Sequence, residues 1–248
     1  MELDERRSLL RSLHVRGNPL VLPNAWDAAS ALAVVEAGFA AVATSSSAVA
    51  ESLGYEDGEG APAAEMFAAA ARIARVIDIP LTVDAEAGYG MAADEFVDAL
   101  SAAGAAGCNF EDTDHATGSI TDAATQTARL AAIRAAAGDG GLVLNARVDV
   151  FLRNRSTPQA ELLDEGVERA RAYLGAGADC VYPIFLSDDE VIGRFVESVG
   201  GPVNILAGTG APDRDRLAEL GVARISYGAG LHHRVMSHFA DLLAAIPR

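Results

Sequence analysis

Two acidic residues, Asp84 and Glu86, directly follow the apolar run Leu81-Thr82-Val83. Alternate residues of a β-strand point to the same face, so these two carboxylates are expected to lie side by side. Unpaired carboxylates on one face repel each other unless water solvates them, one of them holds a proton, or a cation lies between them. The pair is therefore a candidate for metal binding or for acid–base chemistry.

Polar side chains follow other apolar runs of the sequence in the same way. They are Ser45, Ser46 and Ser47, then Glu111, Asp112, Arg147 and Asp149. Asp57 lies in the long loop after the second run, and Asn204 lies within the run 203–206. Each residue taken singly fits a helix cap, a loop acid or a structural ion pair. Because they recur at the same end of successive apolar runs, we expect most of them to share one site.

The residue types at these positions favour one chemistry. Asp57, Asp84, Glu86 and Glu111 offer hard oxygen ligands, with few histidines or cysteines nearby, which favours Mg²⁺, or Mn²⁺ in its place. Arg147 offers a two-pronged donor for a carboxylate or phosphonate, and the serine run can turn backbone N–H groups and hydroxyls toward the same anion. A metal next to an anion clamp suits a 2-oxo acid, whose carboxylate and carbonyl can chelate the cation.

Short apolar runs alternate with alanine-rich helical patterns along the whole chain. The expected strands are 20–22, 40–43, 81–84, 107–110, 142–145, 180–182, 203–206 and 223–226. The expected helices are 25–37, 63–77, 93–103, 123–136, 158–174, 188–199, 213–220 and 231–246, with glycine caps at Gly38, Gly104, Gly138, Gly175, Gly200 and Gly221. Eight such units predict an α/β protein, a single (β/α)8 TIM barrel domain over 1–248 with a short N-terminal helix; a doubly wound sheet is the alternative. Barrel enzymes build their sites at the C-terminal ends of the strands, where the polar residues above fall.

Composition excludes several classes of partner. The formal net charge of -16 disfavours sequence-independent binding to nucleic acid or to anionic membranes. The charged start of the chain does not resemble a signal peptide, and no apolar run is long enough to span a bilayer. Cys108 and Cys180 lie in apolar runs, as small core residues do. We therefore expect a cytoplasmic protein.

Five segments resemble the isocitrate lyase and phosphoenolpyruvate mutase superfamily, in its short-chain branch, which includes 2-methylisocitrate lyase-like and oxaloacetate decarboxylase-like proteins. They are LPNAWDAASALAVVEAGFAAVATSSSAVAESLGYEDGE, VDAEAGYG, GAAGCNFED, LNARVD and PVNILAGTGAPDRDRLAELGVARISYG. The resemblance implies a barrel in which Asp84 contacts Mg²⁺ while Asp57, Glu86 and Glu111 hold its waters. It also implies that Ser45, Ser46, Ser47 and Arg147 grip a substrate carboxylate, and that a bond next to a 2-oxo acid is made or broken through an enolpyruvate-like intermediate.

The sequence departs from this family pattern at three places. Asp84-Ala85-Glu86 replaces the common Asp-x-Asp. The lid segment EDTDHATGSITDAATQ carries neither the lyases' cysteine and lysines nor the mutases' asparagine and lysine. The chain ends soon after its last helix, whereas many relatives continue into a helix that is exchanged between subunits; we still expect a homo-oligomer, either a dimer or a tetramer.

Several single residues have two interpretations. His115, in the lid, is either a solvated loop residue or the acid–base group in place of the cysteine. Tyr182 could donate its hydroxyl into the site or belong to the core, and Asn204 is a further candidate for substrate binding. His232 and His233 fit capping or surface positions. The candidate catalytic residues are Arg147, His115 and Glu111.

The function predicted from these residues is a Mg²⁺-dependent carbon–carbon lyase or decarboxylase. Its substrate would be a small 2-oxo or hydroxy dicarboxylic acid, such as oxaloacetate or a malate-like compound. A decarboxylase needs fewer protein groups than a lyase, because CO₂ leaves without a leaving-group base. The alternatives are a phosphonopyruvate hydrolase or phosphoenolpyruvate phosphonomutase, and a non-catalytic 2-oxo acid binding protein.

Overall fold

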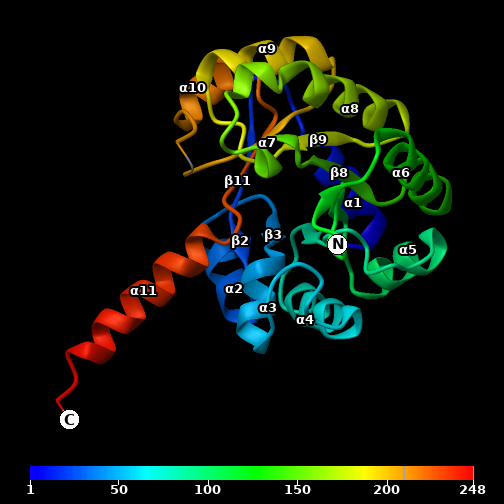
Figure 1. The fold of residues 1–248 in the computed structure, drawn as a ribbon. Coiled ribbons are helices and arrows are strands. Elements are labelled where there is room, and N and C mark those ends of the chain that lie inside the picture. The colour runs from blue at the N-terminus through cyan, green and yellow to red at the C-terminus, as the bar shows by residue number, and fades with distance from the viewer. Residues whose placement is uncertain (209, 248) are drawn as a thin grey trace.

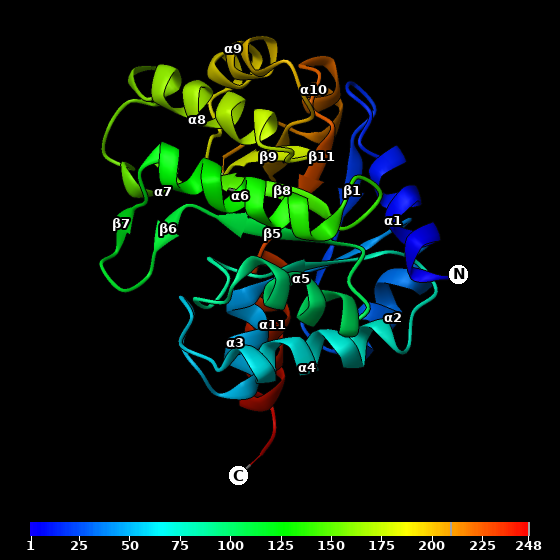
Figure 2. The same ribbon diagram turned by 90° about the vertical axis from the view of Figure 1, so that its right-hand side faces the viewer.

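Parallel strands make up the centre of the molecule. The computed structural model describes residues 1–208 and 210–247, and Figures 1 and 2 show its strands surrounded by helices. Six strands pair in the order β2 (Asn24–Ala25), β3 (Val42–Thr44), β4 (Leu81–Asp84), β5 (Gly107–Glu111), β8 (Val143–Val148) and β9 (Cys180–Pro183). Three more pair in the order β1 (Leu20–Leu22), β11 (Arg224–Ser226) and β10 (Asn204–Leu206).

These two sheets join into a closed eight-stranded barrel. At one seam, Pro23 lies between β1 and β2, so the first barrel strand pairs with β11 through its first half and with β3 through its second. Pro23 has no N–H to donate, but its carbonyl accepts from Ala43 N at 3.1 Å. At the other seam, a parallel bridge between Val181 and Val203 connects β9 to β10. The predicted TIM barrel is therefore confirmed.

The helices that follow the strands include those predicted, with ends that differ by a few residues, but 46–53 and 150–153 were not predicted and the expected helix 158–174 is divided in two. They are α1 (Leu3–Ser12), α2 (Ala28–Glu36), α3 (Ser46–Leu53), α4 (Ala63–Ala74), α5 (Ala93–Ala102), α6 (Ala123–Ala137), α7 (Val150–Arg153), η1 (Gln159–Glu161), α8 (Leu163–Gly175), α9 (Asp189–Val199), α10 (Arg214–Glu219) and α11 (Gly230–Ala244). Four begin at an aspartate, Asp27, Asp122, Asp188 or Asp213, whose carboxylate accepts from the backbone N–H three residues later. Such caps satisfy an N–H that the helix itself leaves free.

The apolar core is continuous around the barrel. One cluster of buried residues runs from Ala25 on β2 to Ile225 on β11 and fills the layer between strands and helices. This continuity supports the proposal that the chain is a single domain. In the described ranges, no helix combines the length and the apolar character needed to cross a membrane.

Some details differ from the sequence-based expectations. Gly175 is the last residue of α8 rather than a left-handed cap, because the chain turns two residues later, at Gly177, with φ of 102°. A side chain at Gly177 would meet Arg134 Cγ at 2.6 Å. The serine run continues into α3, and β8 extends through Val148, so Arg147 belongs to the strand itself.

The last helix, α11, does not cover the barrel as an ordinary eighth helix would. Figure 1 shows it projecting away from the other elements, with the C-terminus at its far end. Its apolar side chains Val235, Phe239, Leu242 and Leu243 are each about half exposed, at 51 to 54%.

Candidate functional site

A polar cavity of about 260 Å³ opens at the C-terminal ends of the strands. Its lining is Ser46, Asp57, Gly58, Glu86, Glu111, Thr113, His115, Arg147, Leu152 and Arg153. These residues come from α3 and the loop after it, from the segment after β4, from β5 and the hairpin after it, from β8 and from α7. The cavity thus brings together six of the residues singled out in the sequence, which are Ser46, Asp57, Glu86, Glu111, His115 and Arg147.

Asp84 lies beside this cavity, at the end of β4, and is held by its neighbours. Its Oδ2 accepts from both the backbone N–H and the hydroxyl of Ser46, each at 2.9 Å, and its Oδ1 accepts from Asn109 Nδ2 at 3.1 Å. Ser46 stands at the start of α3, where a free N–H is available. The carboxylate therefore has a fixed orientation before any ligand binds.

Glu86 is the most constrained acid of the site. It has a positive φ of 48°, which is uncommon for a residue with a side chain, and is only 2% exposed. Its carboxylate accepts from the backbone N–H of Glu59 and from the hydroxyl of Tyr89, the latter at 3.0 Å. Burial raises the pKa of Glu86 to about 7, and the nearby carboxylates of Asp84 and Asp57 raise it further. Such local strain and desolvation are features of functional sites.

Glu111 connects a histidine and an arginine. His115 Nε2 lies 2.7 Å from Glu111 Oε1, and Arg147 Nη1 lies 2.5 Å from Glu111 Oε2. Burial raises the pKa of Glu111 to about 7, although Arg147 and His115 act in the opposite direction. The Glu111 carboxylate beside the imidazole in turn raises the pKa of His115. Glu111 and His115 together can hold and transfer a proton near neutral pH.

Arg147 is already paired on one edge. Its Nε and Nη2 donate to Asp149 Oδ1 and Oδ2 at 2.7 and 2.8 Å, and Asp149 also accepts from the hydroxyl of Thr113. The structural ion pair considered from the sequence is therefore present. The edge that carries Nη1 faces Glu111 and the cavity.

His115 reaches the cavity from a short hairpin. The segment after β5 forms two antiparallel strands, β6 (Thr113–Asp114) and β7 (Ser119–Ile120), with His115 in the turn between them. Gly58 packs against the imidazole so closely that a Cβ there would lie 3.1 Å from His115 Nδ1. His115 is thus a contact residue of the site and not a freely solvated loop residue.

The remaining sequence candidates lie apart from the cavity lining. Asn204 is fully buried and exchanges hydrogen bonds with Ser226 at 3.2 and 3.3 Å, and Tyr182, 3% exposed, also interacts with Ser226. These side chains belong to the barrel interior. Ser45 is the N-cap residue of α3 and Ser47 lies in its first turn, and neither lines the cavity.

Five residues of the site were not singled out from the sequence. Glu59 and Tyr89 hold Glu86, while Gly58, Thr113 and Leu152 line the cavity. All three residues of the turn Gly88-Tyr89-Gly90 have positive φ. The glycines on both sides of Tyr89 are a sequence pattern that could have drawn attention to this residue. Glu59 also has a positive φ, of 60°, and its contact with Glu86 depends on the path of the loop after α3, which no local pattern specifies.

The donor set fits a hard divalent cation. Asp57, Glu86 and Glu111 line one cavity with Asp84 beside it, and burial is the main cause of the raised pKa values of Glu86 and Glu111. Within residues 1–208 and 210–247, these acids do not bring three ligand atoms within 4.8 Å of one another. Mg²⁺ uses few direct protein ligands and keeps several of its waters, so it does not require three of these atoms to be adjacent.

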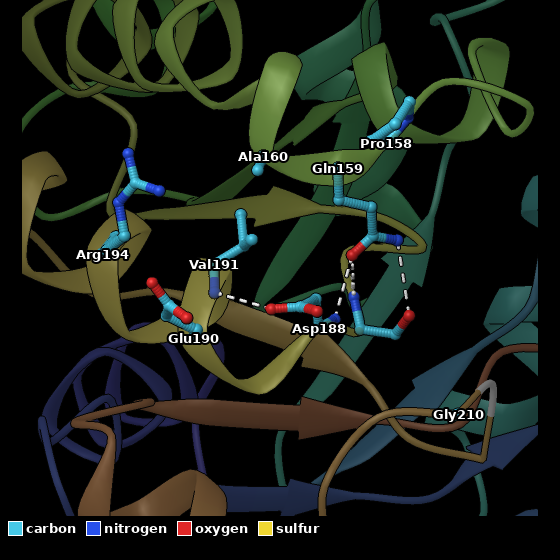
Figure 3. A pocket seen from close by; sticks show the side chains of 9 residues that line it. Pro158, Gln159, Ala160, Asp188, Glu190, Val191, Arg194 and Gly210 are labelled. Carbon is cyan, nitrogen blue, oxygen red and sulfur yellow. Dashed lines mark hydrogen bonds between the residues drawn. The ribbon is translucent and has the colours of Figure 1, made fainter.

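A second cavity, of about 530 Å³, is lined mainly by three segments: η1, the loop that follows β9, and helix α9. Figure 3 shows Gln159 at its edge; the amide accepts from the backbone N–H groups of Ser187 and Asp188 and donates to Phe185 O. Asp188 caps Val191 N at 3.0 Å. Because these polar groups already bind backbone, this cavity is a weaker candidate for chemistry.

Comparisons with known proteins add an independent observation. The family model described as phosphoenolpyruvate phosphomutase matches residues 10–247. An uncharacterised protein of Mycobacterium tuberculosis is 36% identical over 226 residues, covering 89% of this chain and 83% of its own length. A protein of Corynebacterium glutamicum named probable 2-methylisocitrate lyase 2 is 32% identical over 208 residues, covering 80% and 66%. A solved structure from Burkholderia cenocepacia, provisionally assigned as a phosphonomutase, has 40% identity and a TM-score of 0.91, covering 97% of this chain and 99% of that one.

Proposed function

The chain belongs to the phosphoenolpyruvate phosphomutase family, and from this premise we propose that it is a Mg²⁺-dependent carbon–carbon lyase or decarboxylase. Its substrate would be a small 2-oxo or hydroxy dicarboxylic acid. The observation that carries the proposal is the pair of buried acids, Glu86 and Glu111, with pKa values near 7 in one cavity with Arg147 and His115. Named lyases among the relatives support it.

The proposed cation site uses four carboxylates. Asp84 would contact Mg²⁺ directly, because its orientation is fixed by Ser46 and Asn109, while Asp57, Glu86 and Glu111 would hold its waters. When bound, Mg²⁺ would polarise the substrate carbonyl and balance the charge that develops on its oxygen. Mn²⁺ could take its place.

The chain's own groups would bind the substrate and move a proton. The Nη1 edge of Arg147 and the serines at the start of α3 would hold the substrate carboxylate. His115, whose pKa is raised by Glu111, would carry a proton at Nε2 and deliver it to the product carbanion. The hairpin that carries His115 would exclude water until that proton has been transferred.

The lid favours carbon chemistry over phosphorus chemistry. Its segment 113–121 contains no lysine for a phosphoryl group. It also lacks the lyases' cysteine, which favours decarboxylation over C–C cleavage. We therefore place decarboxylation or C–C cleavage first. Phosphonopyruvate hydrolysis, phosphonate transfer and mere binding of a 2-oxo acid are alternative outcomes of the same experiment.

The experiment is a substrate panel with product detection. The protein with Mg²⁺ is incubated with oxaloacetate, 2-methylisocitrate, methylmalates and phosphonopyruvate, and pyruvate, CO₂ and phosphate are measured. Pyruvate with CO₂, or pyruvate with a second carboxylic acid, supports the proposal. Phosphate from phosphonopyruvate supports the phosphonate alternative. Binding without any product would leave a 2-oxo acid binding protein.

We also propose that the protein forms a homo-oligomer, either a dimer or a tetramer, through α11. The exposed apolar face of α11 lies next to a groove of about 850 Å³ lined by α2 and the base of α11, including Trp26, Val34 and Phe39. An apolar surface of this kind is typical of protein–protein contact. Light scattering of Phe239→Asp should give a smaller mass than wild type, while Val15→Asp, at a comparably exposed site on the barrel, should not. A cytoplasmic location stays a prediction.

A further inference from the structure

Three potential metal ligands converge outside the site described above. Glu51 lies on α3, and His232 and His233 lie in the first turn of α11. The ligand atoms of these three side chains all lie within 4.8 Å of one another. The two helices leave the same rim of the barrel, after β3 and β11, although their residues are far apart in the sequence.

His232 provides a second observation. Its side chain is only 4% exposed, and its Nδ1 is buried without a hydrogen-bond partner. Glu51 Oε2 lies 3.4 Å from that nitrogen, but the two atoms do not form a hydrogen bond. A buried polar atom without a partner is costly, so a ligand at this position would satisfy it.

The indole of Trp26 restricts the orientation of this imidazole. The rings of Trp26 and His232 meet edge to face, with centroids 4.8 Å apart and planes at 69°. In this orientation His232 Nδ1 is the ring nitrogen that faces Glu51. On the solvent side, His233 Nε2 lies 3.9 Å from the same Glu51 oxygen.

We propose that Glu51, His232 and His233 bind a divalent transition-metal ion of the Zn²⁺ type. Two imidazoles and one carboxylate are ligands that Zn²⁺, Ni²⁺ and Cu²⁺ prefer, whereas Mg²⁺ prefers oxygen alone. Tetrahedral ligands about 2.0–2.2 Å from Zn²⁺ lie roughly 3.3 Å from one another, close to the 3.4 and 3.9 Å between these atoms. Glu51 and His233 are more than half exposed and can adjust, and water completes the fourth position.

The bound ion would join α11 to the barrel. It would connect the first turn of the projecting helix to α3, whose other end holds Asp84 through Ser46. The role is structural, and the site does not depend on the proposed reaction. The positive end of the α11 dipole opposes a cation there, and the carboxylate of Glu51 offsets it.

The chain's single tryptophan allows a direct test, because Trp26 touches His232. Full-length protein is stripped of metal, saturated with Mg²⁺ to fill the proposed acidic site, and titrated with Co²⁺ while Trp26 fluorescence is recorded. The expected result is quenching that saturates at one Co²⁺ per chain and is reversed by Zn²⁺. Loss of outer-shell groups alone weakens metal sites about 10- to 100-fold, so Glu51→Gln and His233→Ala, each lacking a ligand, should bind Co²⁺ at least about 100-fold more weakly.

Both substitutions are at exposed positions, so the variants should fold, and circular dichroism checks that they do. His238→Ala, which removes another histidine of α11, is the matched control and should bind Co²⁺ like wild type. The proposal would be overturned if one equivalent of Co²⁺ caused no quenching of Trp26. It would also be overturned if quenching were equal in wild type, Glu51→Gln and His233→Ala.

Discussion

The substitution Glu86→Gln should stabilise the metal-free protein at alkaline pH. The pKa of Glu86 rises from 4.5 to about 7 on folding, mainly through burial. A carboxyl whose pKa is raised on folding contributes stability that is complete below pH 4.5 and is lost as pH rises through 7. At about 1.4 kcal/mol per pKa unit, the ionised Glu86 costs about 3 kcal/mol at pH 8.

Glutamine removes this cost because it carries no charge. It also gives up one acceptor oxygen, since Glu59 N–H and Tyr89 OH both donate to Glu86, and this loss costs about 1 kcal/mol. The net gain at pH 8 is then about 2 kcal/mol. The free energy of unfolding of Glu86→Gln minus that of wild type should therefore increase by about 2.5 kcal/mol from pH 5 to pH 8.

Urea unfolding in EDTA at these two pH values measures the effect. Glu197→Gln, at an exposed position on α9, is the control and should change stability little and equally at both pH values. With Mg²⁺ present the order should reverse, because wild type then gains a cation that the variant binds less well. An identical difference between Glu86→Gln and wild type at pH 5 and pH 8 in EDTA would refute the reasoning.

Three further substitutions test the roles of single residues. Arg147→Lys should weaken oxalate binding by roughly 1.5–3 kcal/mol, because lysine's ammonium lacks the planar fork of the guanidinium; calorimetry measures this loss. Normal oxalate affinity in a folded variant would mean that Arg147 has only a structural role, as the ion-pair partner of Asp149. His115→Ala should lower turnover while oxalate affinity stays nearly unchanged, since oxalate imitates the enolate and needs no proton; unchanged turnover would exclude His115 as the proton donor. Gly58→Val should lower turnover in the same way, because Gly58 has φ of 81° and its Cβ would press on the imidazole, and a fully active variant would show that the position of His115 does not matter.

The sequence predicted the barrel and its rim because both depend on short-range patterns. Apolar runs followed by alanine-rich stretches mark the strand–helix units, and parallel strands bring their C-terminal ends to one rim, so Glu86, Glu111 and Arg147 had to gather there. Arrangements that depend on the paths of loops could not be predicted from the sequence. The sequence left open whether the serines cap a helix and whether Arg147 pairs with Asp149, and it did not show that Ser46 binds Asp84.

The same limit applies to residues that are far apart in the sequence. His115 could be interpreted in two ways until the hairpin brought it within 2.7 Å of Glu111. His232 looked like a surface or capping residue, because nothing local shows that α11 places it against Trp26 and Glu51. The projection of α11 away from the barrel was also not encoded in its amphipathic pattern, which would equally fit a helix on the barrel surface.

The most direct test of the proposed function is Mg²⁺-dependent release of pyruvate. Metal-stripped protein is incubated with each 2-oxo or hydroxy dicarboxylic acid of the panel, first in EDTA and then with excess Mg²⁺, and pyruvate is measured. We predict that at least one substrate gives catalytic amounts of pyruvate only when Mg²⁺ is present. Equal turnover in EDTA, or no pyruvate from any of them with Mg²⁺, would contradict the assignment as a Mg²⁺-dependent lyase or decarboxylase.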